Sequence, residues 1–253
     1  MTAIIDARGL GKRYRSRWAL TDCTLSIPAG RVIGLVGPNG AGKTTLLHLV
    51  TGLLAPTTGT IEVVGNPPAA SAAQLGRVGF VAQDTPTYPA FSVADHLRLG
   101  AHMNPGWDAR LAADRVKKLN LDPAAKAGRL SGGQRAQLAL TLAIAKRPEL
   151  LILDEPVASL DPLARRDFLQ DLTGAVAEHH MSVVLSSHVV ADLKRACDYL
   201  VVLTAGRVRL AGEVSELLAA YRLRAGMQAD LEDLVLAYMS QPAVRQHVTE
   251  ETR

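Results

Sequence analysis

The chain has 253 residues, of which 48% are hydrophobic and only 4% aromatic, so we expect a large core of aliphatic side chains. Its formal net charge is +4, from 28 Lys and Arg against 24 Asp and Glu, and no block of basic residues marks a nucleic-acid-binding arm. We therefore expect no nucleic acid partner. The two cysteines form neither a disulfide framework nor a metal-ligand spacing, and the longest apolar runs are strand-sized, which excludes a membrane span.

The order of strand-like and helical segments predicts an α/β fold. The early strands are expected at Ala3–Asp6, Leu20–Ile27, Val32–Val36, Thr60–Val64 and Val78–Ala82. Apolar spacing becomes helical from Val93 to about Ala145. Later elements are strands at Leu150–Leu153, Ser182–Ser186 and Tyr199–Leu203, a helix at Pro162–Ala177, a hairpin around Ala205-Gly206, and helices after Glu213. Continuous apolar strands alternating with helices indicate a parallel sheet covered on both faces, interrupted by a helical insertion and preceded by antiparallel strands.

A glycine-rich loop directly follows the strand Val32–Val36. Residues 37–44 read Gly-Pro-Asn-Gly-Ala-Gly-Lys-Thr, the pattern of a loop that holds a nucleotide polyphosphate. Glycines let backbone N–H groups approach phosphate oxygens, and a helix that starts near Gly42 adds its positive dipole end. Lys43 brings an ammonium to the β- and γ-phosphates, and Thr44 offers a hydroxyl to magnesium. A glycine-rich turn with a chance lysine is the alternative, which the flanking strand and helix disfavour.

Two carboxylates follow the apolar segment Leu150–Leu153. The carboxyl ends of parallel strands border the ligand crevice, so we expect Asp154 and Glu155 beside the phosphate loop. Asp154 suits a magnesium ligand, directly or through water. Glu155 is placed to polarise the water that attacks the γ-phosphate. A strand end with two solvated charges is the alternative.

A second anion-binding element is predicted at Leu130-Ser131-Gly132-Gly133-Gln134, just before the helical run from Arg135 to Ala145. Ser131 is placed to cap this helix, and the glycines leave its first N–H groups open. One nucleotide needs only one phosphate loop. The second element therefore points to a nucleotide held by another molecule, and an ordinary serine cap with a glycine turn is the alternative.

Together these motifs resemble the ATP-binding subunits of ABC transporters over at least residues 3–212. The matching elements, in the family's order and spacing, are the phosphate loop, Gln83, Leu130–Gln134, Asp154-Glu155, Ser159-Leu160-Asp161 and His188. The resemblance implies a P-loop NTPase (RecA-like) α/β core with an N-terminal antiparallel β subdomain and an inserted α-helical subdomain. The implied division assigns the core to residues 1–84 and 146–225, the helical subdomain with the signature motif to 85–145, and a helical C-terminal tail to 226–253.

The resemblance also implies how ATP is held. Tyr14 matches the aromatic that stacks on adenine, although Trp18 is close enough to take its place. Asp161 matches a loop that crosses the interface of a dimer. The implied ATP contacts are Tyr14, Gly37, Pro38, Asn39, Gly40, Ala41, Gly42, Lys43, Thr44, Thr45, Ser131, Gly132, Gly133, Gln134 and Asp161.

The catalytic set follows from the same resemblance. Glu155 matches the catalytic base, and His188 matches the switch histidine that contacts the γ-phosphate. Gln83 matches a loop glutamine that touches magnesium and the attacking water. ATP and Mg2+ are therefore the expected cofactors, with Thr44, Gln83 and Asp154 around the metal. A plain surface amide is the alternative for Gln83, and a structural histidine is the alternative for His188. The position of His188 at the carboxyl end of the buried-type strand before it, beside the crevice, favours the catalytic role.

We expect two subunits, identical or different, to close head-to-tail around two ATP molecules. Each nucleotide would lie between Gly37–Thr45 of one copy and Ser131–Gln134 of the other. The helical insertion would dock on transmembrane permease subunits, which places the protein in the cytoplasm on the inner face of the cell membrane. The stretches Ala101–Asp108 and Leu231–Leu236 are similar to those of ABC-2-type export subunits, so export is the expected direction.

Three other functions fit parts of the pattern. A soluble ATPase of the same superfamily, acting with a non-membrane partner, would share every motif. A small-molecule kinase or a GTPase gives no reason for Ser131–Gln134, and the sequence has no Asn-Lys-x-Asp guanine-reading motif. A non-catalytic ATP-gated binding module would bind ATP without releasing phosphate.

Overall fold

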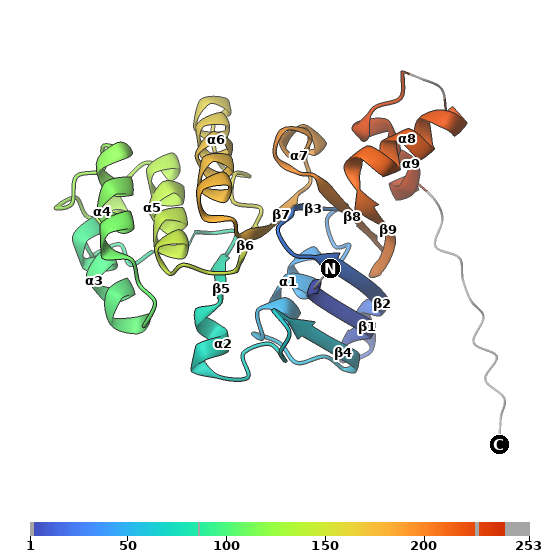
Figure 1. The fold of residues 1–253 in the computed structure, drawn as a ribbon, viewed down its shortest axis with the longest axis horizontal. Coiled ribbons are helices and arrows are strands. Elements are labelled where there is room, and N and C mark those ends of the chain that lie inside the picture. Colours follow the sequence, from blue (N-terminus) through green and yellow to red (C-terminus); the bar gives the residue numbers. More distant parts are fainter. Residues whose placement is uncertain (1–2, 86, 226–227, 241–253) are drawn as a thin grey trace.

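The protein is described by a computed structural model over residues 3–85, 87–225 and 228–240. Its larger sheet has six strands in the order β5-β6-β7-β3-β8-β9. These are β5 (Val78–Val81), β6 (Leu150–Asp154), β7 (Ser182–Ser187), β3 (Val32–Val36), β8 (Tyr199–Thr204) and β9 (Arg207–Glu213). The first five run parallel, and β9 returns antiparallel to β8 (Figure 1). The predicted parallel sheet and the final hairpin are confirmed.

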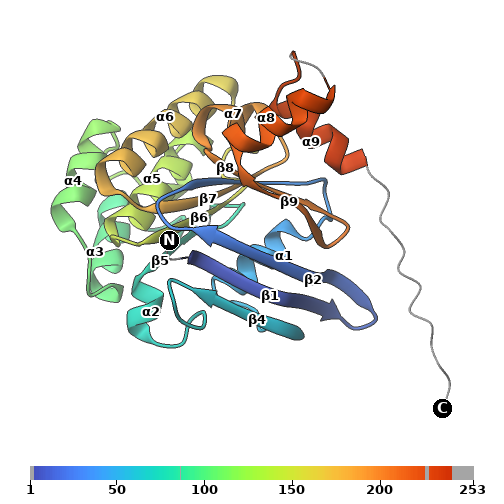
Figure 2. The same cartoon turned by 45° about the vertical axis from the view of Figure 1, so that its right-hand side comes forward.

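A smaller antiparallel sheet lies beneath the first, in the order β2-β1-β4 (Figure 2). Its strands are β1 (Ala3–Tyr14), β2 (Arg17–Pro28) and β4 (Thr58–Val63). Helix α1 (Lys43–Val50) packs between the sheets, because its Leu46, Leu47 and Leu49 share one buried cluster with side chains of both. This packing fixes where the loop before α1 can lie, since both of its ends enter the core.

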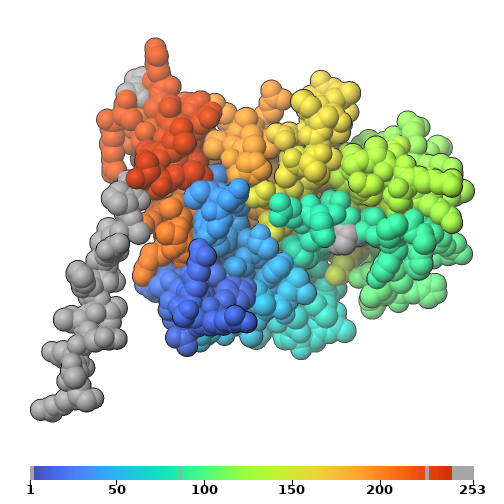
Figure 3. Space-filling model, turned by 180° about the vertical axis from the view of Figure 1, so that it is seen from behind, coloured from blue at the N-terminus to red at the C-terminus, as the bar shows by residue number. Residues whose placement is uncertain are grey.

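The inserted helices form a separate lobe with a small core of its own. Helices α3 (Val93–Met103), α4 (Ala109–Lys118) and α5 (Gly132–Ala145) surround the buried residues Val93, Val116, Leu121, Ala127, Leu130 and Leu138. Seen from behind, this green lobe lies on the right and the blue N-terminal part lies to its left, with teal residues between them (Figure 3). The opposite side of α5 is buried as well, against α6 and the large sheet, so this helix connects the lobe to the rest of the chain.

Helices cover the other face of the large sheet. They are α6 (Pro162–His179), α7 (Val190–Ala196), α8 (Val214–Ala225) and α9 (Leu231–Ser240), and a short α2 (Ala72–Gly76) precedes β5. In the predicted C-terminal tail, α9 accounts for 231–240, and residues 241–253 lie outside the described part. No helix within the described ranges is long and apolar enough to cross a membrane.

Candidate functional site

Neighbouring parallel strands end at one edge of the large sheet, and four of them lead into predicted site residues. Strand β3 leads into the phosphate loop at Gly37, and β6 ends at Asp154. Strand β7 is followed by His188, and β5 is followed by Gln83. These four strands are adjacent, in the order β5-β6-β7-β3. The carboxyl edge of a parallel sheet is where such folds bind ligands, so the topology itself gathers the residues.

Close backbone contacts determine the path of the phosphate loop. A Cβ at Gly37 would lie 2.2 Å from the carbonyl oxygen of Leu203 in β8. Gly42, the N-cap of α1, has φ +104°, and a Cβ there would lie 2.7 Å from the carbonyl oxygen of Ala19. Any other residue at these positions would push the main chain apart. The loop therefore wraps tightly over the end of β3, with Asn39 to Thr45 lining the cleft.

Lys43 lies at the base of the cleft. Its side chain is only 6% exposed, and Nζ donates a 2.8 Å hydrogen bond to the carbonyl oxygen of Gly37. The same nitrogen is 3.2 Å from Oε1 of Glu155. The first turn of α1 carries no acidic side chain, so Lys43 and the helix terminus together form a positive site suited to phosphate.

Glu155 joins three parts of the site. Its Oε1 faces Lys43, while its Oε2 lies 3.0 Å from Nδ1 of His188. Its backbone has φ +46°, in the left-handed region, and its N–H donates a 2.8 Å bond to Oγ of Ser186. The carboxylate is 11% exposed and the histidine 47%, so Glu155 lies inside the cleft and His188 at its border.

One cleft of about 850 Å³ collects most of the predicted residues. The members it brings together are Tyr14, Asn39, Gly40, Ala41, Gly42, Lys43, Thr44, Thr45, Gln83, Glu155 and His188. Tyr14 and Trp18 both line its outer part, and each ring lies under a cation, Lys12 for Tyr14 and Arg13 for Trp18. Both aromatic rings are therefore placed where an adenine platform is expected.

Sequence reasoning missed several lining residues. They are Arg17, Ala19, Ala158, Ala205 and Gly206. Ala205 and Gly206 form the β8–β9 turn, whose backbone meets the phosphate loop through a 3.0 Å bond from the Gly206 N–H to the Ala41 carbonyl. The alanines and Gly206 carry no motif, because they contribute main chain and small side chains from distant segments. Arg17 carried one weak signal, its place in the basic stretch that includes Arg13 and Arg15.

The second predicted anion element lies apart from this cleft. Ser131 caps α5 as predicted, since its Oγ accepts the Gln134 N–H at 3.1 Å, and Gln134 Oε1 accepts the Ser131 N–H at 2.9 Å. Within the described ranges the N–H groups of Gly132 and Gly133 have no acceptor. Ser131, Gly133 and Gln134 border a separate hollow of about 250 Å³. Asp161 also lies outside the cleft, and its Oδ1 accepts the N–H groups of Leu163 and Ala164 at the start of α6.

The residues suggested for magnesium offer oxygen donors only. Asp154 is 2% exposed beneath the cleft, and its Oδ1 accepts the Ser186 hydroxyl at 2.7 Å. Thr44 and Gln83 line the cleft itself. In the part of the chain that is described, no group of three or more His, Cys, Asp or Glu side chains forms a complete metal site. Since Mg2+ is commonly held by one or two protein oxygens together with water and phosphate oxygens, this donor set fits it.

Comparison with known proteins names the family. A family model described as ABC transporter matches residues 20–158. The Nod factor export ATP-binding protein I of Cupriavidus metallidurans is 37% identical over 226 residues, which cover 86% of this chain and 74% of that protein. The Fe(3+) ions import ATP-binding protein FbpC 2 of Rhodococcus jostii is 33% identical over 223 residues, covering 86% and 64%.

Structural similarity agrees with the sequence matches. A solved structure of the ATP-binding subunit of an ABC transporter superposes with a TM-score of 0.81 at 26% identity, and the match covers 93% of this chain and 99% of that one. The α/β P-loop NTPase fold expected from the motifs is thus confirmed. The chain belongs to the ABC transporter family and is an ATP-binding, ATP-hydrolysing subunit of such a transporter.

Proposed function

We propose that this chain drives export by closing with a second ATP-binding subunit around two ATP molecules. The observation that carries the proposal is the presence of two helix N-termini that border different hollows. The α1 terminus opens into the main cleft, and the α5 terminus at Ser131 borders the smaller one. A nucleotide in the main cleft leaves the α5 terminus without a ligand, so a partner subunit supplies the second phosphate group.

In this proposal the cleft residues divide the chemistry of hydrolysis. Lys43 and the N–H groups of the phosphate loop bind the β- and γ-phosphates, and Tyr14 stacks on the adenine. Glu155 accepts a proton from the attacking water, while His188 orients the Glu155 carboxylate and contacts the γ-phosphate. Thr44, Gln83 and Asp154 would hold Mg2+, which supplies charge neutralisation on the phosphates.

The energies suffice for an ATP-driven switch. A charge-assisted hydrogen bond contributes about 1.5–3 kcal/mol, so two sites with one or two such bonds each provide roughly 3–12 kcal/mol. Reversing a two-state equilibrium from 1:99 to 99:1 needs about 5.5 kcal/mol. With two such bonds at each site, roughly 6–12 kcal/mol, the contacts of Ser131 and its neighbours to a γ-phosphate are enough to close the dimer, and their loss after hydrolysis is enough to open it.

The permease and the direction of transport complete the proposal. Transmembrane permease subunits contact the helical lobe and hold this subunit on the cytoplasmic face of the membrane. Export is supported by the relative named for Nod factor export, which is 37% identical, and by the similarity of Ala101–Asp108 to export subunits. The relative named for Fe(3+) import is 33% identical, so the direction requires a transport assay with the cognate permease.

The dimer is tested with Glu155→Gln and Mg2+ATP. We expect ATP to bind, turnover to fall about 100-fold or more through loss of the base, and the protein to run as a dimer in light scattering. The matched control is Glu149→Gln, because Glu149 is exposed, lies at the opposite end of β6 and pairs with Arg77 outside the cleft. Normal turnover in Glu155→Gln, or a monomer under these conditions even with permease present, contradicts the proposal.

A second variant tests which surface closes. A Cβ at Gly132 meets only Leu160 Cδ2, at 3.8 Å, so a side chain is tolerated there. In the Glu155→Gln background, Gly132→Asp places a negative charge at the α5 terminus, where it repels a phosphate. We expect ATP binding to the monomer to persist and the dimer to disappear, whereas Gly132→Asn keeps the dimer. A stable dimer in Gly132→Asp shows that another surface is used.

A further inference from the structure

Ser186 connects the two carboxylates of the site through a single hydroxyl. It lies in β7, is fully buried, and pairs in register with Asp154 of β6. Its Oγ donates a 2.7 Å hydrogen bond to Oδ1 of Asp154 and accepts the N–H of Glu155 at 2.8 Å. A serine hydroxyl has one donor and two acceptor lone pairs, so these bonds use its only proton and one of its lone pairs.

The first bond fixes the direction of the Asp154 carboxylate. Asp154 is 2% exposed, and within the described ranges Ser186 is the sole hydrogen-bond donor to it. A buried carboxylate with one oxygen engaged presents the other in a defined direction. Without the hydroxyl, the side chain would lose this donor and the rotamer that the donor selects.

The second bond holds an unfavourable backbone conformation. Glu155 has φ +46°, which costs energy for any residue with a Cβ and persists only where its surroundings impose it. The Glu155 N–H donates to the Ser186 hydroxyl at the point where the chain leaves β6. This bond fixes the turn that projects the Glu155 side chain toward Lys43 and His188.

We infer that Ser186 is a positioning residue for ATP hydrolysis. Its hydroxyl orients both the carboxylate of Asp154, the proposed magnesium ligand, and the carboxylate of Glu155, the proposed base. The inference rests on the proposed roles of those two residues. Ser186 is fully buried and is not among the residues that line the cleft. It links the two strands whose ends carry the reaction, so a shift of one carboxylate is transmitted to the other.

The test compares Ser186→Ala with Ser182→Ala. Ser182 lies in the same strand and is equally buried, but its hydroxyl accepts the Gly30 N–H at the far end of β7. For Ser186→Ala we expect kcat to fall about 10- to 100-fold, the size of a lost charge-assisted bond, with KM for ATP within about threefold. Ser182→Ala is expected to keep kcat within about twofold while losing comparable thermal stability.

Two further readouts separate positioning from a general structural effect. Calorimetry should show that Mg2+ strengthens ATP binding less in Ser186→Ala than in the wild type, while binding without Mg2+ is unchanged. Ser186→Thr retains the hydroxyl and suits a strand, so it should restore most of kcat. If Ser186→Ala does not fold, Ser186→Cys keeps the volume with a weak donor and should show the same loss of kcat.

The outcomes distinguish this inference from the proposed function. A kcat within twofold of wild type in Ser186→Ala, an equal loss in Ser182→Ala, or no rescue by Ser186→Thr overturns the role of Ser186. If Glu155→Gln nevertheless abolishes turnover, the proposed base stands. Normal turnover in Glu155→Gln removes the proposed function itself, whatever the serine variants do.

Discussion

Nζ of Lys43 lies 3.2 Å from Oε1 of Glu155, at a point where both side chains are largely removed from solvent. Their charges compensate each other, which is what allows an ammonium and a carboxylate to share a buried site. Because Glu155 also contacts His188, one carboxylate connects the loops that follow β3, β6 and β7. Phosphate oxygens that approach Lys43 compete with Glu155 for the same cation, so nucleotide binding and the position of the base are linked.

The first prediction concerns this cation. Lys43→Ala removes the ammonium from the phosphate loop and leaves Glu155 without its buried partner. ATP affinity should fall roughly 10- to 100-fold, the equivalent of one charge-assisted hydrogen bond of about 1.5–3 kcal/mol. Isothermal calorimetry measures it directly. Lys117→Ala, at an exposed lysine of α4, is the control and should bind ATP as the wild type does. Equal affinities in the two variants would rule out a phosphate role for Lys43.

The predictable parts of the site are short contiguous motifs that directly follow a strand. The phosphate loop and Asp154-Glu155 each follow an apolar strand, and His188 follows a buried strand with an apolar centre, so the parallel topology requires them to meet. The link through Ser186 was not predictable, because a serine inside a buried strand has no pattern that reveals its partner. Ala158 and Gly206 were missed for the same reason, since neighbours in space are distant in sequence.

The errors in the predicted elements also have local causes. Strand β1 was expected only over Ala3–Asp6, but it continues to Tyr14, through Gly9 and Gly11 and several register shifts that break the apolar alternation. Helix α7 was not predicted. It has seven residues and begins at Val190 without a side-chain cap, so neither a period nor a start signal marks it. Tertiary packing forms both elements where local signals are weak.

The second prediction compares two glycines, one whose Cβ position is blocked by backbone and one whose Cβ position is open. Gly42→Ala places a Cβ 2.7 Å from the Ala19 carbonyl at φ +104°, so it should destabilise the fold by more than about 1 kcal/mol and weaken ATP binding. Gly174 lies inside α6 with open space around its Cβ position. Gly174→Ala should therefore stabilise the protein by about 0.5–1 kcal/mol without affecting ATP. Urea unfolding of both variants checks the signs, and stabilisation by Gly42→Ala would show that the loop takes another path.

The third prediction concerns the buried ion pair between the helical lobe and the core. Arg115 of α4 pairs with Asp171 of α6, and each side chain is 8% exposed. Lys118 Nζ lies 3.2 Å from the other Asp171 oxygen. Removing one partner of a buried pair leaves an uncompensated charge, so Asp171→Asn should lower the free energy of unfolding by about 3–5 kcal/mol, measured in urea.

Two companion variants identify the cause of that loss. The double substitution Arg115→Met with Asp171→Leu removes both charges and should recover most of the stability, because apolar replacements of similar size often match a buried ion pair. Asp114→Asn breaks an exposed pair, since the side chain of Asp114 is 70% exposed and that of its partner Arg110 is 94% exposed. This variant should change the free energy of unfolding by no more than about 0.5 kcal/mol. Similar losses in Asp171→Asn and Asp114→Asn would show that burial does not decide the effect.

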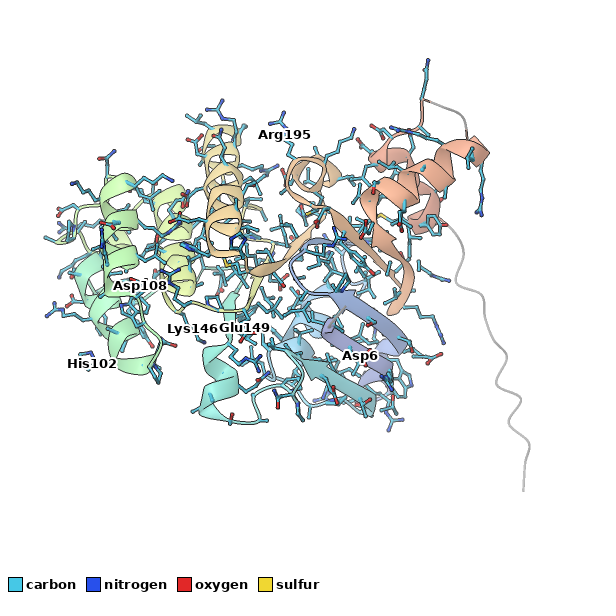
Figure 4. All side chains as sticks on the ribbon, in the orientation of Figure 1. Asp6, His102, Asp108, Lys146, Glu149 and Arg195 are labelled. Carbon is cyan, nitrogen blue, oxygen red and sulfur yellow. The ribbon has the colours of Figure 1, made fainter. Side chains whose placement is uncertain are left out.

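The last prediction is a pH dependence at the start of α4. The Leu111 N–H, and after it the Arg147 guanidinium, hold the pKa of Asp108 below its ordinary value. The Asp108 N–H in turn donates to the Ala145 carbonyl of α5, and Figure 4 shows Asp108 close to Lys146, the residue before Arg147. A carboxylate whose pKa is lower in the folded state adds stability that is fully present above its unfolded pKa of about 3.9 and is lost as the pH falls through the folded pKa.

In Asp108→Asn the amide still caps α4 but cannot titrate, so the stability of the variant should fall less than that of the wild type between about pH 5 and pH 3. Urea unfolding at several pH values measures the difference in the free energy of unfolding between the two proteins, and this difference should shrink as the pH falls. A difference that is constant over this range would mean that Asp108 carries no linked proton.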